Sequence, residues 1–264
     1  MTHRISACVI ARDEEVQLQR CLEALKSLDE TVVLLDARAP ESMDVLAESL
    51  GARVSRREYD GDIEQKCACV ARAENDWVFL VDPDESVPEA LLREVRRAVE
   101  TADHDHRSET SGFEVNRRTH HLGRWIRFGD FYPDWKLRLF RRSRARFAGR
   151  NPHGRIEIAG RVARLEEELL HYSYRDLADQ VDRIQFFSRV AAEALHAEGR
   201  RARVRDWLLR PPARFLRAYV LKQGFRDGVP GFFIAVATAF NVFLKYAKLW
   251  ELERRGADSF GPPR

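Results

Sequence analysis

Three acidic residues stand within four positions, directly after a strongly apolar run. The stretch WVFLVDPDES, residues 77–86, leads into Asp82-Pro83-Asp84-Glu85. Carboxylates this close repel one another and raise each other's pKa, so a positive group is expected among them unless they spread into solvent. Two carboxylates one residue apart can ligate one hard cation, and Mg²⁺ or Mn²⁺ typically keeps positions open for water and substrate phosphates. The alternative is an ordinary acidic turn before a helix, because D-x-D alone is common.

A cation at these acids would determine the chemistry. It would bind a diphosphate and stabilise the negative charge that grows on a leaving nucleoside diphosphate. Pro83 fixes one φ angle and stiffens the turn between the two aspartates. The acids therefore indicate group transfer from a diphosphate-activated donor.

The elements that must position these acids alternate between strand and helix over residues 1–100. Strands are expected at 5–11, 30–36, 52–59 and 76–82, and helices at about 15–25, 41–51, 62–73 and 88–100. This spacing is typical of βαβ units and predicts a largely parallel sheet, whose ligands gather beyond the carboxyl ends of the strands. The side chains expected at that edge are Arg12, Asp13, Glu14, Asp36, Asp82 and Asp84.

The second part of the chain changes character. Short strands are expected at 112–118, 136–142, 145–149 and 155–160, and the pattern is helical from Asp176 onward, with a break at Pro211-Pro212. Residues 228–244 carry no charge, which is 17 positions and short of the ~20 apolar residues of a comfortable membrane span. We expect a helix in or near a bilayer surface, with a buried core helix and a true span as alternatives.

Composition narrows the class of protein. The 264 residues carry a net charge of +3, but residues 1–115 hold 14 Lys/Arg against 26 Asp/Glu and residues 116–264 hold 31 against 16. The basic second half indicates a phosphate-bearing or anionic-membrane partner, unless it only reflects an arginine-rich composition. The absence of GxGxxG and P-loop motifs disfavours dinucleotide enzymes and P-loop NTPases. All four cysteines are expected to be reduced packing residues of a cytosolic protein, which no signal peptide precedes.

Several segments resemble a known family. ISACVIARDEEVQLQRCLEAL, EQKCACVARAENDWVFLVDPDE and YPDWKLRLFRR are similar to family 2 glycosyltransferases of the GT-A fold. LLHYSYRDL, RPPARFLRAYVLKQGFRDGVPGF and FLKYAKLWEL resemble the subgroup of lipopolysaccharide core heptose β-glucosyltransferases. The resemblance implies an α/β GT-A domain over 1–175, with a nucleotide-sugar half at about 1–100 and an acceptor half at about 101–175. A helical region would follow over 176–264, with association to a membrane as one expectation for it.

The resemblance also implies a nucleotide-diphospho-sugar donor and residues that bind it. Residues around A-x-N-E-E of the family, here Ala11, Arg12 and Glu14, would cradle the nucleoside. Asp36 matches an acid that contacts the uracil or ribose, and Lys66 matches a lysine that meets a phosphate. The metal, Mg²⁺ or Mn²⁺, would be held by Asp82 and Asp84 of D-x-D-E and by His171, with Asp82 also facing the donor.

The chain departs from the family pattern at three places. The second Asp of the family's D-S-x-S-x-D-G-T is missing from the segment 36–42, which puts nucleotide recognition in doubt. His153-Gly154 stands where relatives carry His-Glu, so this chain lacks the general base if that glutamate is the base, and Cys67 replaces a usual asparagine. These changes fit an altered specificity or a weakened enzyme.

An inverting transfer needs a carboxylate that takes the proton of the acceptor hydroxyl. Asp134 is the first candidate, with an ion pair to Lys136 or Arg138 as its alternative role, and Glu157 is the second. The residues expected to bind the acceptor are aromatic or cationic: Trp125, Tyr132, Trp135, Arg138 and His153. Their alternative roles are core packing for the aromatic side chains, a loop position without function for the histidine and a solvated strand edge for the arginine.

Three functions remain in competition. The first is a metal-dependent hexosyltransferase that moves a sugar, glucose from UDP-glucose, to a lipopolysaccharide-core or other surface-glycan acceptor at the inner face of the cytoplasmic membrane. The second is a weakened or non-catalytic relative that acts as a nucleotide-binding or membrane-associated scaffold. A nucleic-acid binder is the third, and it rests on the basic half alone without any recognised module. The oligomeric state is left open.

Overall fold

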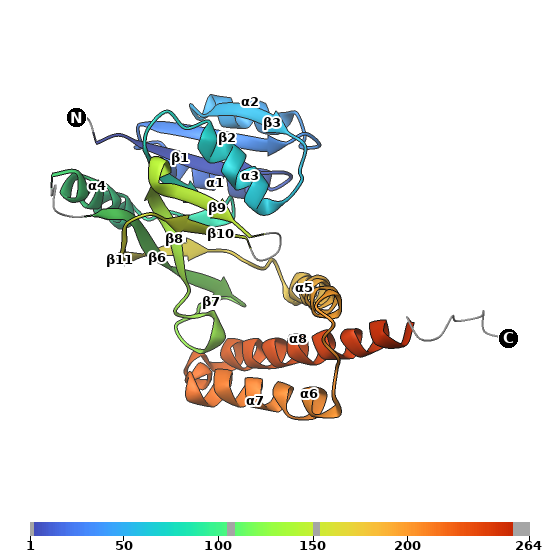
Figure 1. Ribbon diagram of the computed structural model, residues 1–264. Helices are drawn as coiled ribbons and strands as arrows, with labels where there is room; N and C mark the ends of the chain where they lie inside the picture. Colours follow the sequence, from blue (N-terminus) through green and yellow to red (C-terminus); the bar gives the residue numbers. More distant parts are fainter. Residues whose placement is uncertain (1–2, 105–108, 150–153, 256–264) are drawn as a thin grey trace. The chain divides into compact units, whose positions relative to one another are not determined.

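The computed structural model describes residues 3–104, 109–149 and 154–255. The chain divides into two compact units. The sheet unit contains the described residues of 1–118 and 134–171, and the helical unit contains those of 119–133 and 172–264. This division differs from the predicted one, because the segment 119–133 groups with the carboxyl-terminal helices (Figure 1).

The first half of the sheet unit is a parallel sheet, as the alternating pattern predicted. Its strands lie in the order β3-β2-β1-β4, so the first strand of the chain is central. Their bounds are β1 (Ile5–Ala11), β2 (Glu30–Asp36), β3 (Arg53–Arg57) and β4 (Trp77–Val81). In register, Val9 lies opposite Val33 of β2 and Val81 of β4, and all three strands run the same way. Their carboxyl ends therefore meet at one edge.

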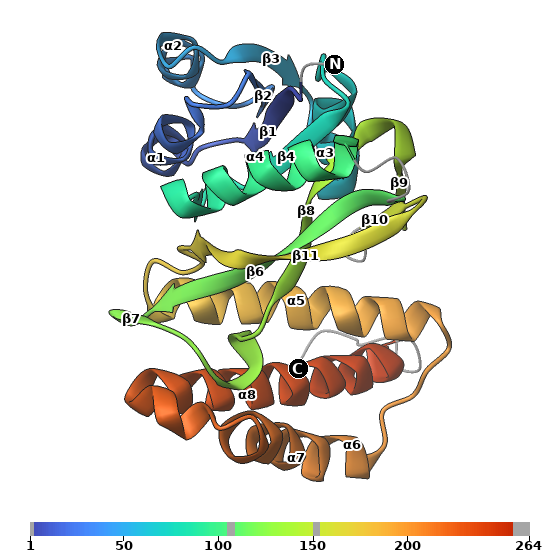
Figure 2. The same cartoon turned by 90° about the vertical axis from the view of Figure 1, so that its left-hand side faces the viewer.

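Helices cover both faces of this sheet (Figures 1 and 2). They are α1 (Glu15–Leu25), α2 (Ser42–Ser49), α3 (Asp62–Ala71) and α4 (Glu89–His104). Successive side chains of a strand point to opposite faces. In β1, Ile5 and Val9 join the core beneath α1, α2 and α4, whereas Cys8 joins the core beneath α3. A strand that is apolar at nearly every position is thus explained by burial on both sides.

The second half of the sheet unit is antiparallel, and it extends the same sheet in the order β4-β8-β6-β11-β5. Its strands are β5 (Glu85–Ser86), β6 (Thr110–His121), β8 (Trp135–Arg141) and β11 (Arg161–His171), with β9 (Ala145–Ala148) and β10 (Arg155–Ile158) as a separate hairpin. The sequence predicted β6, β8, β9 and β10 but not β5 or most of β11, because RVARLEEELLH is mostly polar and solvent-exposed on one face. The fold class, a mixed sheet flanked by helices with a helical carboxyl-terminal region, is confirmed.

The helical unit is built on one long helix. It contains α5 (Leu177–Ala197), α6 (Val204–Leu208), α7 (Arg210–Leu216) and α8 (Gly228–Arg255), with the short helical turns η3 (Arg217–Leu221) and η4 (Gly224–Asp227) before α8. The carboxylate of Asp176 caps α5 by accepting a hydrogen bond from the Asp179 amide at 2.8 Å. Prolines at the first turn of α7 fit a helix start, since their missing amides would have no helical partner. Ala192, Tyr246 and Leu249 form the small buried core.

Two buried aspartates fasten the segment 119–133 to these helices. Asp130, in the turn η1 (Gly129–Phe131), lies 2.8 Å from Arg214 Nε and 3.0 Å from Lys222 Nζ. The Asp227 carboxylate accepts hydrogen bonds from the backbone amides of residues 127 and 128 at 3.0 and 2.8 Å. These polar contacts explain why this segment, with its strand β7 (Arg124–Trp125), belongs to the helical unit.

The cysteines follow the packing prediction with one exception. Cys8, Cys21 and Cys69 are buried in the sheet unit, and burial raises the pKa of the Cys21 thiol. Cys67 lies on the exposed side of α3, so the prediction that it is a packing residue is wrong. The reason is helical geometry, because Cys67 and Cys69 are two positions apart and point to different sides of the helix.

Close packing of α8 against η4 generates a stability prediction. A Cβ at Gly231 would overlap the carbonyl oxygen of Gly224 and lie 2.9 Å from its carbonyl carbon, so Gly231→Ala must move backbone. Overpacking of this kind costs about 1–3 kcal/mol. Urea denaturation should show that loss, whereas Val236→Ala, at a half-exposed position of the same helix, should change the free energy of unfolding by less than ~0.5 kcal/mol. Equal losses in the two variants would contradict the close approach.

Candidate functional site

The carboxyl edge of the parallel strands collects the residues predicted to bind a nucleotide sugar. Ala11 ends β1, Asp36 ends β2, and Asp82 follows β4 directly. Since β2, β1 and β4 are neighbours in the sheet, these three positions lie along one edge. Arg12 reaches across it, with Nε 3.9 Å from Asp36 Oδ2. The topology thus brings the predicted residues together, as expected for a parallel sheet.

Two of these carboxylates shape the loops that leave the strands. Glu14 accepts hydrogen bonds from the backbone amides of Arg12 and Asp13, at 3.0 and 3.1 Å, and thereby closes the turn after β1. Asp36 is 4% exposed and accepts a hydrogen bond from the Arg38 amide at 2.9 Å. Both acids have one side fixed by backbone donors, which orders the loops that a nucleoside would contact.

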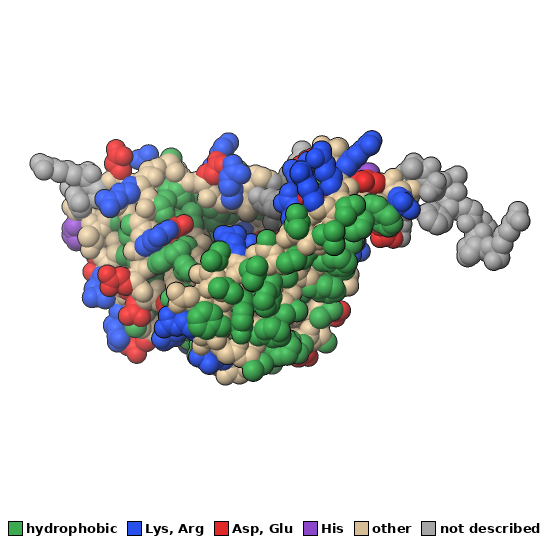
Figure 3. Space-filling view, turned by 90° about the horizontal axis from the view of Figure 1, so that it is seen from below, with side chains coloured by type: hydrophobic (Ala, Val, Ile, Leu, Met, Phe, Trp, Pro, Cys, Tyr) green, Lys and Arg blue, Asp and Glu red, His purple; other side chains and the backbone are tan. Residues whose placement is uncertain are grey.

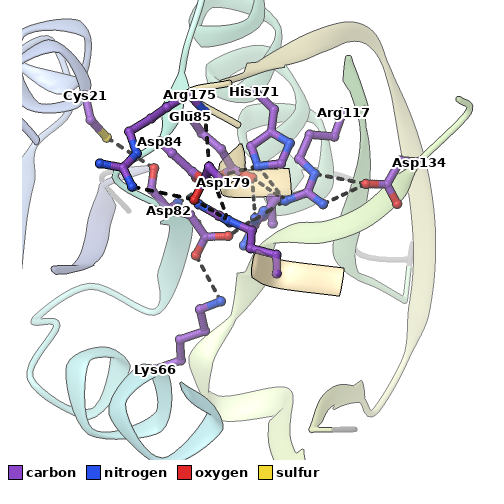
Figure 4. A network of polar contacts seen from close by, with 12 residues as sticks. Cys21, Lys66, Asp82, Asp84, Glu85, Arg117, Asp134, His171, Arg175 and Asp179 are labelled. Carbon is purple, nitrogen blue, oxygen red and sulfur yellow. Dashed lines mark hydrogen bonds and ion pairs between the residues drawn. The ribbon is translucent and has the colours of Figure 1, made fainter. Parts of the chain in front are cut away.

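The acids after β4 are neutralised by the protein itself (Figure 4). Asp82 Oδ1 lies 2.9 Å from Lys66 Nζ of α3, and Asp82 Oδ2 forms an ion pair with Arg138 Nη2 of β8. The same Arg138 nitrogen contacts Glu85 Oε1. Arg138 is 5% exposed and Glu85 1% exposed, so these are buried charges. The positive group expected among these acids is therefore Arg138, from a strand that is distant in sequence, together with Lys66.

This arrangement controls protonation. Burial alone would raise the pKa of Asp82, but the charges of Arg138 and Lys66 outweigh it and lower the pKa well below its usual range. Burial would likewise lower the pKa of Lys66, and Asp82 raises it instead. Around neutral pH the aspartate is a carboxylate and the lysine is an ammonium. A donor that enters this site meets fixed charges rather than groups that can change protonation.

Asp84 and His171 form a second pair in the same corner. His171 Nε2, at the end of β11, lies 3.3 Å from Asp84 Oδ2. Arg117 of β6 lies on the other side of this histidine, with Nη1 3.5 Å from His171 Nε2 and 3.2 Å from Glu85 Oε1. Two residues predicted as metal ligands, Asp84 and His171, are thus brought within ligand reach of each other.

The corner suits a cation that takes few protein ligands. Each Asp82 oxygen already contacts a cationic side chain, and the other two predicted ligands, Asp84 and His171, lie 3.3 Å apart at Oδ2 and Nε2. Among the described residues no group of three or more His, Cys, Asp and Glu side chains is arranged as a metal site. A cation with one or two protein ligands, completed by phosphate oxygens and water, still fits this donor set, and such ligation is common for Mg²⁺.

Asp134, the first candidate base, is held by two cations. Its Oδ2 lies 2.8 Å from Arg117 Nη2 and its Oδ1 lies 3.0 Å from Lys136 Nζ. Burial would raise the pKa of Asp134, but Arg117 and Lys136 outweigh it and lower the pKa. The alternative role foreseen for this residue, an ion pair, is therefore present, with Arg117 in the place of Arg138.

Glu157, the second candidate, stands in the β9–β10 hairpin. Arg146 and Arg155 contact its two carboxylate oxygens, Arg146 at 2.5 Å and Arg155 at 2.6 Å. These hydrogen bonds, led by that from Arg146, lower the pKa of Glu157. Glu157 sits within strand β10 rather than in a turn, and its carboxylate is half-exposed.

Gly154 cannot hold the glutamate of the relatives without rearrangement. A Cβ at this position would lie 2.6 Å from Ile63 Cβ and 2.8 Å from Ile63 Cγ1 of α3. Real Cβ atoms do not approach other carbons so closely, and a β-branched side chain has little freedom to withdraw. Any side chain at Gly154 would therefore require α3 or the strand that follows Gly154 to move.

The predicted acceptor residues are divided between the units. Trp135 belongs to the sheet unit, where the Arg164 guanidinium lies 4.4 Å from its ring centroid. Trp125 and Tyr132 belong to the helical unit, and Trp125 packs edge-on against Tyr172 at 5.4 Å between ring centroids. Arg138 faces the acids of the corner. His153 lies outside the described residues.

Sequence reasoning assigned no role to Arg117 or Glu85, yet both are central to the corner. Glu85 accepts a hydrogen bond from the Asp82 amide at 2.9 Å, which folds the D-x-D-E turn onto itself. Arg117 connects Glu85, His171 and Asp134. Residues 110–121 are mostly polar and hold three charged side chains, so the sequence offered no signal that distinguishes Arg117, whose partners lie in three other segments.

Comparisons with known proteins agree with this geometry. The family model described as Glycosyl transferase family 2 matches residues 6–158. A Rickettsia bellii protein named as an uncharacterized glycosyltransferase is 26% identical over 262 residues, covering 96% of this chain and 88% of the relative. The lipopolysaccharide core biosynthesis glycosyltransferase LpsC of Rhizobium meliloti is 26% identical over 254 residues, covering 94% of this chain and 92% of LpsC.

A solved structure of S. aureus TarS covers 96% of this chain and 92% of its own, at 15% identity and a TM-score of 0.47, which is too low to support an argument. The fold assignment rests instead on the family match and on the mixed sheet with acids at the carboxyl edge of its parallel half, which is the GT-A arrangement. The family match spans more than half of the 264 residues, and the chain therefore belongs to glycosyl transferase family 2.

Proposed function

We propose that this glycosyltransferase moves a hexosyl group, glucose from UDP-glucose, with inversion to a lipopolysaccharide-core or other surface-glycan acceptor. The observation that carries the proposal is the corner after β4, where Asp84 and His171 meet beside an Asp82 held by Lys66 and Arg138. The acceptor class is supported by the likeness to LpsC, which is named for lipopolysaccharide core biosynthesis.

In this proposal the edge of the parallel sheet binds the donor. The loop at Ala11, Arg12 and Glu14, together with Asp36, holds the nucleoside, and Lys66 faces the diphosphate. Asp84 and His171 would hold Mg²⁺ or Mn²⁺, which supplies a Lewis acid for the diphosphate leaving group. Arg138 keeps Asp82 ionised and in place, so Asp82 acts as a fixed negative charge that orients Lys66.

Proton removal from the acceptor is assigned to Asp134, with Glu157 as second candidate. Either carboxylate is ionised at neutral pH, because cationic neighbours lower its pKa. A low pKa makes a weak base, so in this proposal acceptor binding must shift a cation away from the carboxylate. Trp135 of the sheet unit is assigned to the acceptor, whereas Arg138 is buried against Asp82 and Glu85 and is assigned to that pair.

A scaffold role is the second candidate, and specific observations favour it. Both candidate bases are tied to two cations each, and Gly154 leaves no room for the glutamate of relatives. A scaffold of this kind would bind the nucleotide sugar at the same edge of the sheet without catalysing transfer of the sugar.

We also propose that the protein acts at the inner face of the cytoplasmic membrane, where a lipid-linked acceptor would be available.

Replacing Asp84 tests the donor site. Asp84→Asn removes the only carboxylate of the proposed cation pair, so transfer from UDP-glucose should fall by about 100-fold. The rise in melting temperature with UDP-glucose and Mn²⁺ should shrink with it. Release of UDP with and without Mn²⁺ is the measurement. Glu89→Gln, an exposed acid of α4, is the matched control and should behave as wild type. If wild type binds UDP-glucose but never releases UDP, the scaffold role replaces the enzyme.

The pH profile distinguishes the two candidate bases. Lys136→Met removes a cation from Asp134 and Arg146→Met removes one from Glu157, so each raises the pKa of one carboxylate. A base works in its deprotonated form, and a higher pKa therefore moves the acid limb of kcat/KM to higher pH, by up to about one unit.

We expect the limb to move in Lys136→Met and to stay in Arg146→Met. Lys26→Met, on exposed α1 surface, controls for loss of a positive charge alone. The opposite pattern would assign the base to Glu157, and an unmoved limb in both variants would exclude the two carboxylates.

A further inference from the structure

Helix α8 is apolar on both of its long faces. One stripe is buried against the rest of the helical unit and includes Ile234, Ala235, Tyr246 and Leu249. The opposite stripe is between 38% and 66% exposed and carries no charge. Its members recur three and four positions apart: Val229, Phe232, Phe233, Val236, Phe240 and Phe243. A helix on a water-facing surface normally has polar residues there, so this stripe is expected to meet a second apolar phase.

The apolar surface continues over the segment that precedes α8. Leu209, Leu216, Val220, Leu221 and Phe225 are between 50% and 77% exposed. Ring contacts connect the two parts, since the Phe232 centroid lies 5.9 Å from that of Phe215 and 5.7 Å from that of Tyr219. Figure 3 shows hydrophobic side chains gathered over one face of the molecule. A patch of this extent marks an interaction surface rather than scattered exposure.

The exposed charge beside this patch is positive. Residues 199–227 hold nine Lys and Arg but only two acids, Asp206 and Asp227. Both acids are buried, at 5% and 1% exposure. Arg210 Nε lies 2.6 Å from Asp206, and backbone amides bind Asp227. Arg214 and Lys222 pair with the buried Asp130 of the segment 119–133, and the other basic side chains give this surface a positive charge that complements an anionic partner.

Lys245 of α8 lies near three of these cations. Burial, and then the charges of Arg210, Arg200 and Arg214, lower the pKa of Lys245, with Asp206 acting in the opposite direction. Lys245 Nζ and the Arg210 guanidinium also lie 4.7 and 5.1 Å from the centroid of the Tyr246 ring. Like charges held together repel, and a bound phosphate would relieve the repulsion.

The geometry favours a position of α8 at the surface of a bilayer over a helix that crosses the membrane. Residues 224–254 are long and apolar enough to cross a membrane. Within their apolar stretch of 18 residues, 22% is buried inside the protein. One long face of α8, however, packs against its neighbours, and Lys245 and Lys248 stand on the same helix. A core helix is excluded by the exposed stripe. Helices with an apolar face, aromatic residues and basic flanks lie in the headgroup boundary.

We propose that the helical unit is a monotopic membrane-docking module whose partner is the surface of an anionic lipid bilayer. The exposed stripe of α8 and the apolar side chains of 209–225 enter the acyl boundary. Lys245 and the basic side chains of 199–227 that are not paired with Asp130 or Asp206 bind lipid phosphates. The inference rests on the membrane localisation proposed above and gives it a surface and a lipid class, and it does not depend on the transfer reaction.

Vesicle sedimentation of the full chain tests the apolar surface. Wild type should sediment with vesicles containing phosphatidylglycerol and much less with phosphatidylcholine alone. Val229→Glu and Leu221→Glu should weaken binding by at least about tenfold, because a charge then enters the acyl boundary. Val16→Glu is the matched control, since Val16 is 70% exposed on a helix of the sheet unit and Val229 is 66% exposed. Unchanged melting temperatures would show that the variants fold.

Charge removal tests the phosphate cluster. Lys245→Gln should weaken binding to phosphatidylglycerol vesicles by about fivefold, and higher salt should reduce the difference. Lys26→Gln should have no effect.

Wild type that stays in the supernatant, or equal losses in Val16→Glu and Val229→Glu, would overturn the proposal. Light scattering would reveal a dimer that Val229→Glu dissociates, and a dimer without vesicle binding would assign the face to a second copy. Release of UDP from UDP-glucose by wild type, measured without vesicles, tests the proposed transfer reaction independently of membrane binding.

Discussion

The proposed donor site depends on one buried cation, the guanidinium of Arg138. It joins Asp82 and Glu85, which β4 and the following turn bring together, and without it these carboxylates would keep only Lys66 and Arg117 among the cations described around them. Breaking such a buried pair on one side is strongly destabilising. Arg138 comes from an antiparallel strand that lies next to β4, so the antiparallel half of the sheet completes the site that the parallel half begins.

The two units solve different physical problems. The sheet unit buries apolar strands on both faces and concentrates charge at one edge, where cations and carboxylates alternate from Lys66 to Asp134. The helical unit has a small core and leaves apolar side chains outside. The transfer proposed above, from a water-soluble nucleotide sugar to a lipid-linked acceptor, would need both units, since its substrates come from different phases.

The sequence predicted the parts of the site that are local. Asp82 and Asp84 follow a strand, and Asp36 ends another, so the alternation of strands and helices was enough to place them at one edge. It did not predict what neutralises them. Arg138 and Arg117 sit 56 and 35 positions beyond Asp82, and their basic strands also fit a solvated edge or an acceptor surface.

Hydrophobic periodicity and strand-helix spacing predicted the parallel half of the sheet, because a strand apolar at every position must be covered on both faces. The same periodicity showed an uncharged helix near the carboxyl end but left its surroundings open, since a core helix and an interfacial helix have equal composition. Only the tertiary structure decided this. Packing buries one stripe of α8, leaves Val229 and its neighbours exposed, and moves the segment 119–133 into the helical unit through Asp130 and Asp227. Such contacts join distant positions, and no local pattern encodes them.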